Sequence, residues 1–182
     1  MSKVFSFLVL AFLLFVASDA TNKIVNISEI CKKTTNPPLC LDAFNSSTIG
    51  KDLVSLSQVS IETVRALLLG VVFELKTYVP VSPVGPKAKA HYKKCLELFG
   101  EEGALSDIYD SEQALKMKDY LDMVVHANAV SDRIRVCVSG LSPGEPLFPI
   151  PDLLPGYSQS LEAIKLMISI IHIISNDLMR GY

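Results

Sequence analysis

Apolar residues recur along this chain at three- and four-residue intervals, which is the spacing of one face of an α-helix. Four long stretches carry such a stripe, over residues 53–78, 92–115, 123–137 and 157–178. Only Ser60 interrupts the first stripe, while Gly100 and Gly103 loosen the second. The bulky positions Leu67, Ile108, Ile164 and Ile171 indicate a filled core. The pattern predicts four amphipathic helices.

The prolines agree with this division of the chain. All ten fall in three clusters, at 37–38, 80–86 and 143–155. Because proline disrupts helix interiors, the stretches between the clusters are free to form long helices. Period-2 alternation is not sustained anywhere, and no Asn-Gly or Asp-Gly hairpin turn occurs. We therefore predict an all-α fold with an antiparallel four-helix bundle, and interpret the third cluster as a stiff connection between helices.

Two short helices are predicted before the bundle, from the segments "ISEIC" and "NPPLCLDAF". Asn36 suits the N-cap of the second, and Pro37 suits its first position, where the missing N–H has no helical partner. Helices this short are marginal alone. A disulfide between Cys31 and Cys40 would hold them together as a hairpin.

The first twenty residues have the features of a secretory signal peptide. Lys3 is followed by a largely apolar run of fourteen residues, shorter than the roughly 20 of a membrane span, and then by small residues suited to cleavage. We expect a signal peptide at 1–20, a hairpin at about 21–50 and a bundle at about 51–182. The chain would then be secreted, with no membrane association after cleavage. The sequons at Asn26 and Asn45 are candidate glycosylation sites.

In an oxidising compartment, four cysteines indicate two disulfides. Three pairings are possible from the sequence. We favour Cys31–Cys40 with Cys95–Cys137, because the first pair needs only a local turn. Each cysteine of the second pair lies on the apolar stripe of its own predicted helix, so that bridge would join two helices from inside.

No catalytic motif is evident. The chain lacks the nucleophile, metalloprotease and phosphate-loop patterns, and the net charge of −2 with no basic run gives no indication of nucleic-acid binding. His91, His126 and His172 lie on three different predicted helices, which does not favour a metal site. The acidic groups Glu101–Glu102 and Asp107 with Asp110 fit a solvated helix face better than an acid–base pair. We expect a binding protein without enzymatic activity or cofactor.

The residues resemble the plant pectin methylesterase and invertase inhibitor family. The resemblance rests first on "ISEICKKTTNPPLCLDAF", with its Thr-x-Asn-Pro turn between two cysteines. It continues through "KDLVSLSQVSIE", "YKKCLELF", "KDYLDMVVHANAVSDRIRVC" and "SLEAIKLMISIIHIISNDL". It covers the chain after the signal segment and is weakest in the proline-rich stretch.

The resemblance implies a helical hairpin on a four-helix bundle and the bridges Cys31–Cys40 and Cys95–Cys137. It also implies an inhibitor secreted to the plant cell wall (apoplast), with pectin methylesterase as the favoured partner because of the Asn-Pro turn, and invertase as the alternative. Glu97, Glu101 and Asp107 are candidate contacts. In this family a Thr usually precedes the fourth cysteine and an acidic residue follows it, whereas this chain has Val136 and Val138 at these positions. The Thr lies near the contact with pectin methylesterase, so the resemblance implies that Val136 is a candidate contact too.

The sequence leaves open one alternative function and the oligomeric state. A secreted helical binding module without an enzyme target would be distinguished by a cavity between the helices. The inhibitor could be a monomer, or a dimer formed by exchange of the hairpin between chains.

Overall fold

The structure is a computed structural model that describes residues 25–45, 52–81, 85–139 and 156–181. The described residues form helices joined by turns and contain no strand, so the predicted all-α class is confirmed. The helices are α2 (Ile27–Lys32), α3 (Pro37–Asn45), α4 (Leu53–Tyr78), α5 (Pro86–Phe99), α6 (Ala104–Lys116), α7 (Tyr120–Ser139) and α8 (Tyr157–Met179). The predicted signal peptide and the proline-rich segment 143–155 lie outside the described residues.

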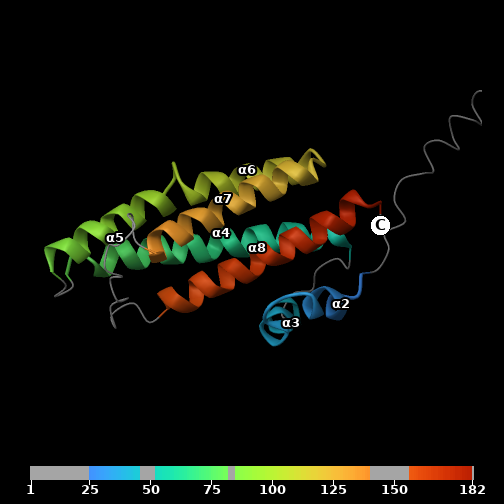
Figure 1. Ribbon diagram of the computed structural model, residues 1–182, viewed down its shortest axis with the longest axis horizontal. Coiled ribbons are helices and arrows are strands. Elements are labelled where there is room, and N and C mark those ends of the chain that lie inside the picture. The colour runs from blue at the N-terminus through green and yellow to red at the C-terminus, as the bar shows by residue number, and fades with distance from the viewer. Residues whose placement is uncertain (1–24, 46–51, 82–84, 140–155, 182) are drawn as a thin grey trace, which may run out of the picture.

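The bundle consists of α4, the consecutive pair α5 and α6, α7, and α8, running in alternating directions (Figure 1). Helix α4 packs against α8 on one side and against α6 on the other, while α7 lies between α6 and α8. Each helix thus contacts the next around a closed ring. This is the predicted antiparallel four-helix bundle, with its second helix divided into α5 and α6.

The second bundle helix is broken, which the sequence indicated only as a loosened stripe. Helix α5 ends at Phe99 and is capped by Gly100, whose N–H donates to the Leu96 carbonyl, and α6 begins after Gly103. A Cβ on Gly103 would lie 2.1 Å from the carbonyl oxygen of Leu98, so a side chain cannot fit there. The close approach of these two backbone segments therefore requires glycine and separates α5 from α6.

The core follows the predicted stripes, with one correction on α4. Leu67, expected in the core, is half-buried, while its neighbour Leu68 is fully buried between the helices. An α-helix has 3.6 residues per turn, so the residue that lies closest to Val64 on the inward face, one turn later, is Leu68 and not Leu67. Ser60 is buried in the stripe, and its hydroxyl donates to the Leu56 carbonyl at 2.9 Å.

Helix α4 is also apolar on part of its outer face. Its residues Leu53–Thr77 are long and apolar enough to cross a membrane, by length and composition alone. The same helix makes extensive contacts with α8 and α6, which is how a core helix of a bundle behaves.

The N-terminal hairpin forms as predicted. The Asn36 side chain accepts a hydrogen bond from the Leu39 N–H at 3.2 Å and caps α3. The Cys31–Cys40 bridge joins α2 to α3, with 5.5 Å between the two Cα atoms. Lys33 reaches α8, where its Nζ lies 3.3 Å from the Asp177 carboxylate. The hairpin therefore packs outside the bundle, along α8 (Figure 1).

Candidate functional site

The second predicted bridge, Cys95–Cys137, joins α5 to α7 inside the bundle, with 5.2 Å between the Cα atoms. The described residues contain no free cysteine. Two polar side chains contact the bridge. His91 Nε2 lies 3.5 Å from Cys95 Sγ, and the Tyr157 hydroxyl of α8 lies 3.1 Å from Cys137 Sγ. Both bridge sulfurs and both polar neighbours are buried, and burial raises the pKa of Tyr157 well above its usual range.

The three histidines do not converge. His126 lies 3.4 Å from Asp122 one turn earlier on α7, and His172 on α8 contacts the side chain of Asn128 at 2.5 Å. Burial lowers the pKa of His172. His91 is the histidine that lies against the bridge. The imidazoles therefore occupy separate environments, and no three-histidine site forms among them.

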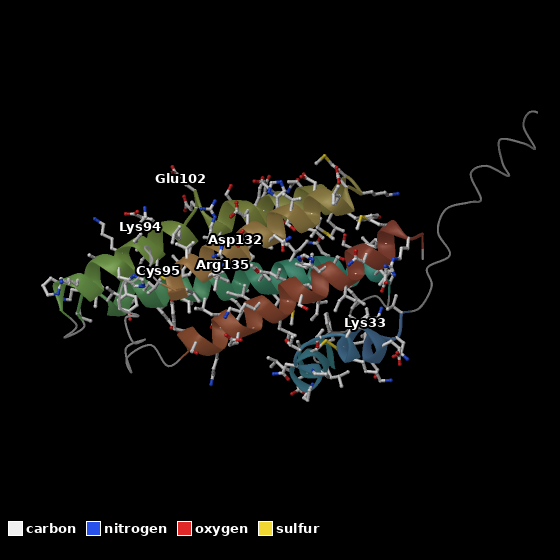
Figure 2. The ribbon with its side chains drawn as sticks, in the orientation of Figure 1. Lys33, Lys94, Cys95, Glu102, Asp132 and Arg135 are labelled. Carbon is white, nitrogen blue, oxygen red and sulfur yellow. A yellow bond between two sulfur atoms is a disulfide. The ribbon has the colours of Figure 1, made fainter. Side chains whose placement is uncertain are left out.

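Glu97 and Glu101 lie on the surface, at and just beyond the end of α5. Glu97 accepts a hydrogen bond from Lys94 Nζ at 2.8 Å, and that lysine lowers the pKa of its carboxyl group. Glu101 and Glu102 are exposed in the turn between α5 and α6. Figure 2 shows Glu102 projecting outward from this break. The break therefore presents two carboxylates beyond the helical surface.

Asp107 has a different environment. Its carboxylate forms an ion pair with the Arg133 guanidinium of α7, and only 14% of the Asp107 side chain is exposed. This pairing raises the pKa of Arg133. Asp107 thus joins α6 to α7. A partner that contacts the Asp107 carboxylate would have to share it with Arg133.

Val136 lies half-buried on α7, directly before the bridge cysteine Cys137. Val138, directly after Cys137, is exposed. The outer face of α7 also carries an exposed pair, Arg135 with Asp132 at 3.1 Å (Figure 2). The residues around the fourth cysteine therefore include both apolar and charged side chains that a partner can reach.

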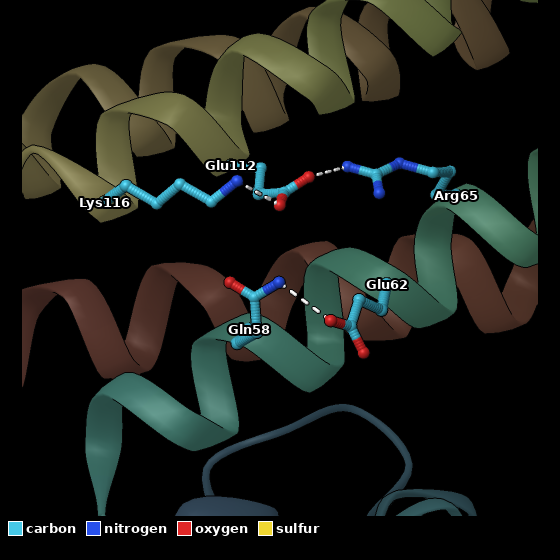
Figure 3. Close-up of polar contacts among 5 residues, drawn as sticks. All are labelled: Gln58, Glu62, Arg65, Glu112 and Lys116. Atoms are coloured by element: carbon cyan, nitrogen blue, oxygen red, sulfur yellow. Dashed lines mark hydrogen bonds and ion pairs between the residues drawn. The ribbon is translucent and has the colours of Figure 1, made fainter.

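A second ionic cluster links α4 to α6. Glu112 accepts hydrogen bonds from Lys116 Nζ at 2.7 Å and from the Arg65 guanidinium (Figure 3). Lys116 and then Arg65 lower the pKa of Glu112 from 4.5 to about 2. On the neighbouring turn of α4, exposed Glu62 accepts a hydrogen bond from Gln58 at 2.8 Å (Figure 3).

Sequence reasoning missed an exposed apolar strip on α4. Ala66, Leu69, Gly70 and Phe73 are all exposed, at the three- and four-residue spacing of one helix face. Leu69 and Phe73 have 51% and 65% of their surface exposed. The signal was present, because α4 is apolar on more of its circumference than a single core stripe needs. We call these four residues the α4 outer strip.

The described residues also line an open pocket of about 510 Å³ outside the bundle. Leu39 of the hairpin, Leu67 of α4 and the first turns of α8 from Gly156 form its walls. The centre of the bundle is filled instead by fully buried side chains such as Ile108, Ile164 and Ile171. The pocket therefore lies between the hairpin and the bundle, away from the core.

Comparison with known proteins gives matches in sequence and in structure. A pectinesterase inhibitor of Actinidia deliciosa is 33% identical over 113 residues, which span 61% of this chain and 60% of that relative. Pectinesterase inhibitor 1 of Arabidopsis thaliana is 25% identical over 129 residues, spanning 71% of this chain and 72% of the relative. No family model matches the chain.

Solved structures match the fold. A mutant form of a pectin methylesterase inhibitor from Arabidopsis superposes with a TM-score of 0.69 and 22% identity, covering 84% of this chain and 96% of the other. A pectin methylesterase inhibitor from Arabidopsis thaliana gives 0.60 and 23% identity, covering 84% and 95%. The predicted family resemblance is confirmed. This chain resembles the pectin methylesterase inhibitors in its sequence and shares their helical fold, and its own fold contains two bridges.

Proposed function

We propose that this protein inhibits a plant pectin methylesterase by covering its substrate cleft. The observation that carries the proposal is the joint match in sequence and fold to proteins named as inhibitors of that enzyme. The residues around the two bridges carry the sequence resemblance and lie within this helical fold. The protein would act in the cell wall after removal of residues 1–20, and it would contribute no catalytic group of its own.

A rigid surface is what such an inhibitor needs. Binding loses affinity when flexible side chains and loops must be ordered, so a preformed helical surface retains more of its contact energy. The Cys95–Cys137 bridge fixes α5 against α7, and the Arg133–Asp107 pair fixes α7 against α6. An interface of standard size buries about 800 Å² on each partner, an area that two or three neighbouring helices can supply.

We assign the centre of this surface to the α4 outer strip. Exposed apolar and aromatic side chains on a rigid helix provide anchors that typically dominate binding energy. Helix α5 packs next to α4 and carries Glu97, and its end leads to Glu101. Charged groups at the rim of an apolar centre are typical of protein interfaces. We include half-buried Val136 in the proposed surface, because its helix α7 contacts α5.

Parallel titration of two enzymes tests the proposed function. Purified, oxidised protein is added at mildly acidic pH to a plant pectin methylesterase and, separately, to a cell-wall invertase. We expect stoichiometric loss of methylesterase activity and full invertase activity. Inhibition of invertase alone would assign the chain to the alternative target. Full activity of both enzymes would contradict an inhibitory role and favour a secreted binding module of the same fold.

Substitution of the most exposed apolar residue of the α4 outer strip tests the surface. Phe73→Ala should weaken inhibition about tenfold or more, because truncation of an aromatic anchor removes buried contact area at the centre of an interface. Leu121→Ala on α7 is the matched control, since Leu121 is 64% exposed and Phe73 is 65% exposed, but Leu121 lies outside the strip. Equal inhibition constants for the two variants would exclude Phe73 from the interface.

The carboxylate at the rim is tested by charge reversal. Glu97→Lys should weaken inhibition several-fold at low salt and less at high salt, because a rim charge acts mainly through screened electrostatics. Glu162→Lys on α8 is the control, because Glu162 forms the same exposed i,i+3 pair, with Lys165 at 2.9 Å, that Glu97 forms with Lys94. If Glu162→Lys weakens inhibition as much as Glu97→Lys does, the effect comes from net charge and not from the proposed rim.

A further inference from the structure

The surroundings of the Cys95–Cys137 bridge contain the parts of a metal site. The Nε2 atom of His91 and the two sulfur atoms all lie within 4.8 Å of one another, and all three residues are buried. His91 and Cys95 are four residues apart on α5, so both side chains point from one face of that helix, and Cys137 faces them from α7. This is the one group of possible metal ligands found among the described residues.

We propose that, when this bridge is reduced, His91, Cys95 and Cys137 bind a divalent cation of the zinc type. The metal then replaces the disulfide as the link between α5 and α7. Imidazole nitrogen and thiolate sulfur are the ligands that zinc prefers, and three protein ligands leave a fourth position for water.

The reaction has two steps. A dithiol reductant first transfers two electrons to the bridge: the sulfur–sulfur bond of Cys95–Cys137 breaks, both cysteines take up protons, and the reductant becomes a cyclic disulfide. The cation then binds the two sulfurs as thiolates, which releases the two thiol protons to solvent. Neutral His91, in the tautomer that carries its proton on Nδ1, donates its Nε2 lone pair.

One of the existing distances already fits a tetrahedral ion, and the separation of the two sulfurs changes on reduction. With zinc–sulfur and zinc–nitrogen bonds of about 2.3 and 2.0 Å, tetrahedral angles place nitrogen and sulfur ligands about 3.5 Å apart. His91 Nε2 already lies 3.5 Å from Cys95 Sγ. The same geometry needs about 3.8 Å between two sulfur ligands. Because the Cα atoms of Cys95 and Cys137 are 5.2 Å apart, rotation of the side chains suffices to separate the sulfurs by that distance.

The surroundings also favour thiolate ligands. The Tyr157 hydroxyl lies 3.1 Å from Cys137 Sγ and is the donor in this contact, since a bridged sulfur carries no hydrogen. After reduction the same O–H can donate to the thiolate, as the partners that surround metal ligands commonly do. The Cys31–Cys40 bridge offers no such arrangement, because no histidine groups with it among the described residues. It therefore serves as an internal control.

Cobalt(II) is a suitable probe, because thiolate coordination gives a charge-transfer absorption and tetrahedral geometry gives visible bands. A Cys31→Ser/Cys40→Ser chain, which keeps only the bundle bridge, is reduced with dithiothreitol, desalted without oxygen and titrated with cobalt(II), then with zinc(II) in competition. We expect one cobalt per chain with both spectral signatures, displacement by zinc, and no such signal from the oxidised chain. Absence of the bands after reduction would overturn the proposal.

Two variants identify the ligands. His91→Gln in the same background should bind cobalt at least tenfold more weakly and shift the visible bands, because a nitrogen ligand is lost. Unchanged affinity and spectrum would show that the thiols alone bind metal and would refute the site. If the Cys31→Ser/Cys40→Ser chain loses its helical circular dichroism, the fully reduced natural chain is compared with Cys95→Ser/Cys137→Ser instead. The bands must disappear in that double variant, and their persistence would place the metal at the hairpin.

Discussion

Replacing Cys95 and Cys137 together by serine will lower the free energy of unfolding by about 4 kcal/mol in the chain-entropy description of a disulfide. The bridge joins cysteines with a sequence separation of 42 residues, so its removal greatly increases the conformational entropy of the unfolded chain. Both sulfurs lie in the core, and the serine hydroxyls would be buried there. Urea unfolding of the oxidised chain and of the double variant, followed by circular dichroism, measures the difference.

The hairpin bridge provides the matched control. Cys31→Ser/Cys40→Ser opens a loop with a sequence separation of only 9 residues, for which the same description gives about 2.5 kcal/mol. The hairpin also packs outside the bundle, so the helices of the bundle remain in contact when the hairpin bridge is removed. A larger destabilisation from the hairpin variant than from the bundle variant would contradict this account. It would mean that the hairpin is essential for bundle packing.

The fold was predictable because its determinants are local and periodic. Each bundle helix carries an apolar stripe with helical spacing, and the prolines fall between helices. The N-cap role of Asn36 was predictable too, since an Asn before Pro at a helix start acts within its own turn. The break between α5 and α6 was not, because it depends on the approach of the Gly103 backbone to Leu98, which no residue pattern specifies.

The candidate site was predictable only in part. The bridges followed from the cysteine count, the local turn and the family resemblance, and the structure confirms both. The pairing of Asp107 with Arg133 joins residues that lie 26 positions apart on two helices, so their contact depends on the rotation of each helix in the bundle. The exposure of Phe73 depends on the same rotation. Periodicity identifies an apolar face, but a helix with two apolar faces does not indicate which one points outward.

The two apolar faces of α4 matter for the proposed function. A helix that is apolar on its inner face for packing and on part of its outer face for recognition uses one rigid element for both tasks. In α4 the buried Leu68 precedes the exposed Leu69, so adjacent residues serve the core and the surface. Anything that rotates α4 would therefore change the proposed contact surface. The Arg65–Glu112 ion pair between α4 and α6 opposes such a rotation.

Glu112→Gln will lower the free energy of unfolding by about 2 kcal/mol at neutral pH, because it removes the negative charge that pairs with two cations. The side chain of Glu112 is only 11% exposed, whereas those of Arg65 and Lys116 are 33% and 55% exposed. Solvent around the two cations screens the pairs, which is why we expect less than the full effect of the pKa shift. Glu62→Gln is the control, since exposed Glu62 has Gln58 as its hydrogen-bond partner.

The pH dependence of this difference is the sharper test. The pKa of Glu112 falls from 4.5 to about 2 on folding, so between these values the unfolded chain binds more protons than the folded protein. The stabilisation by Glu112 is therefore complete above about pH 5 and is lost as the pH falls toward 2. Urea unfolding at several pH values should show the natural chain and Glu112→Gln converging at low pH, while Glu62→Gln follows the natural chain throughout. A difference between the natural chain and Glu112→Gln that stays constant down to pH 3 would mean that the glutamine variant loses packing, and that the charge of Glu112 contributes little to holding α4 against α6.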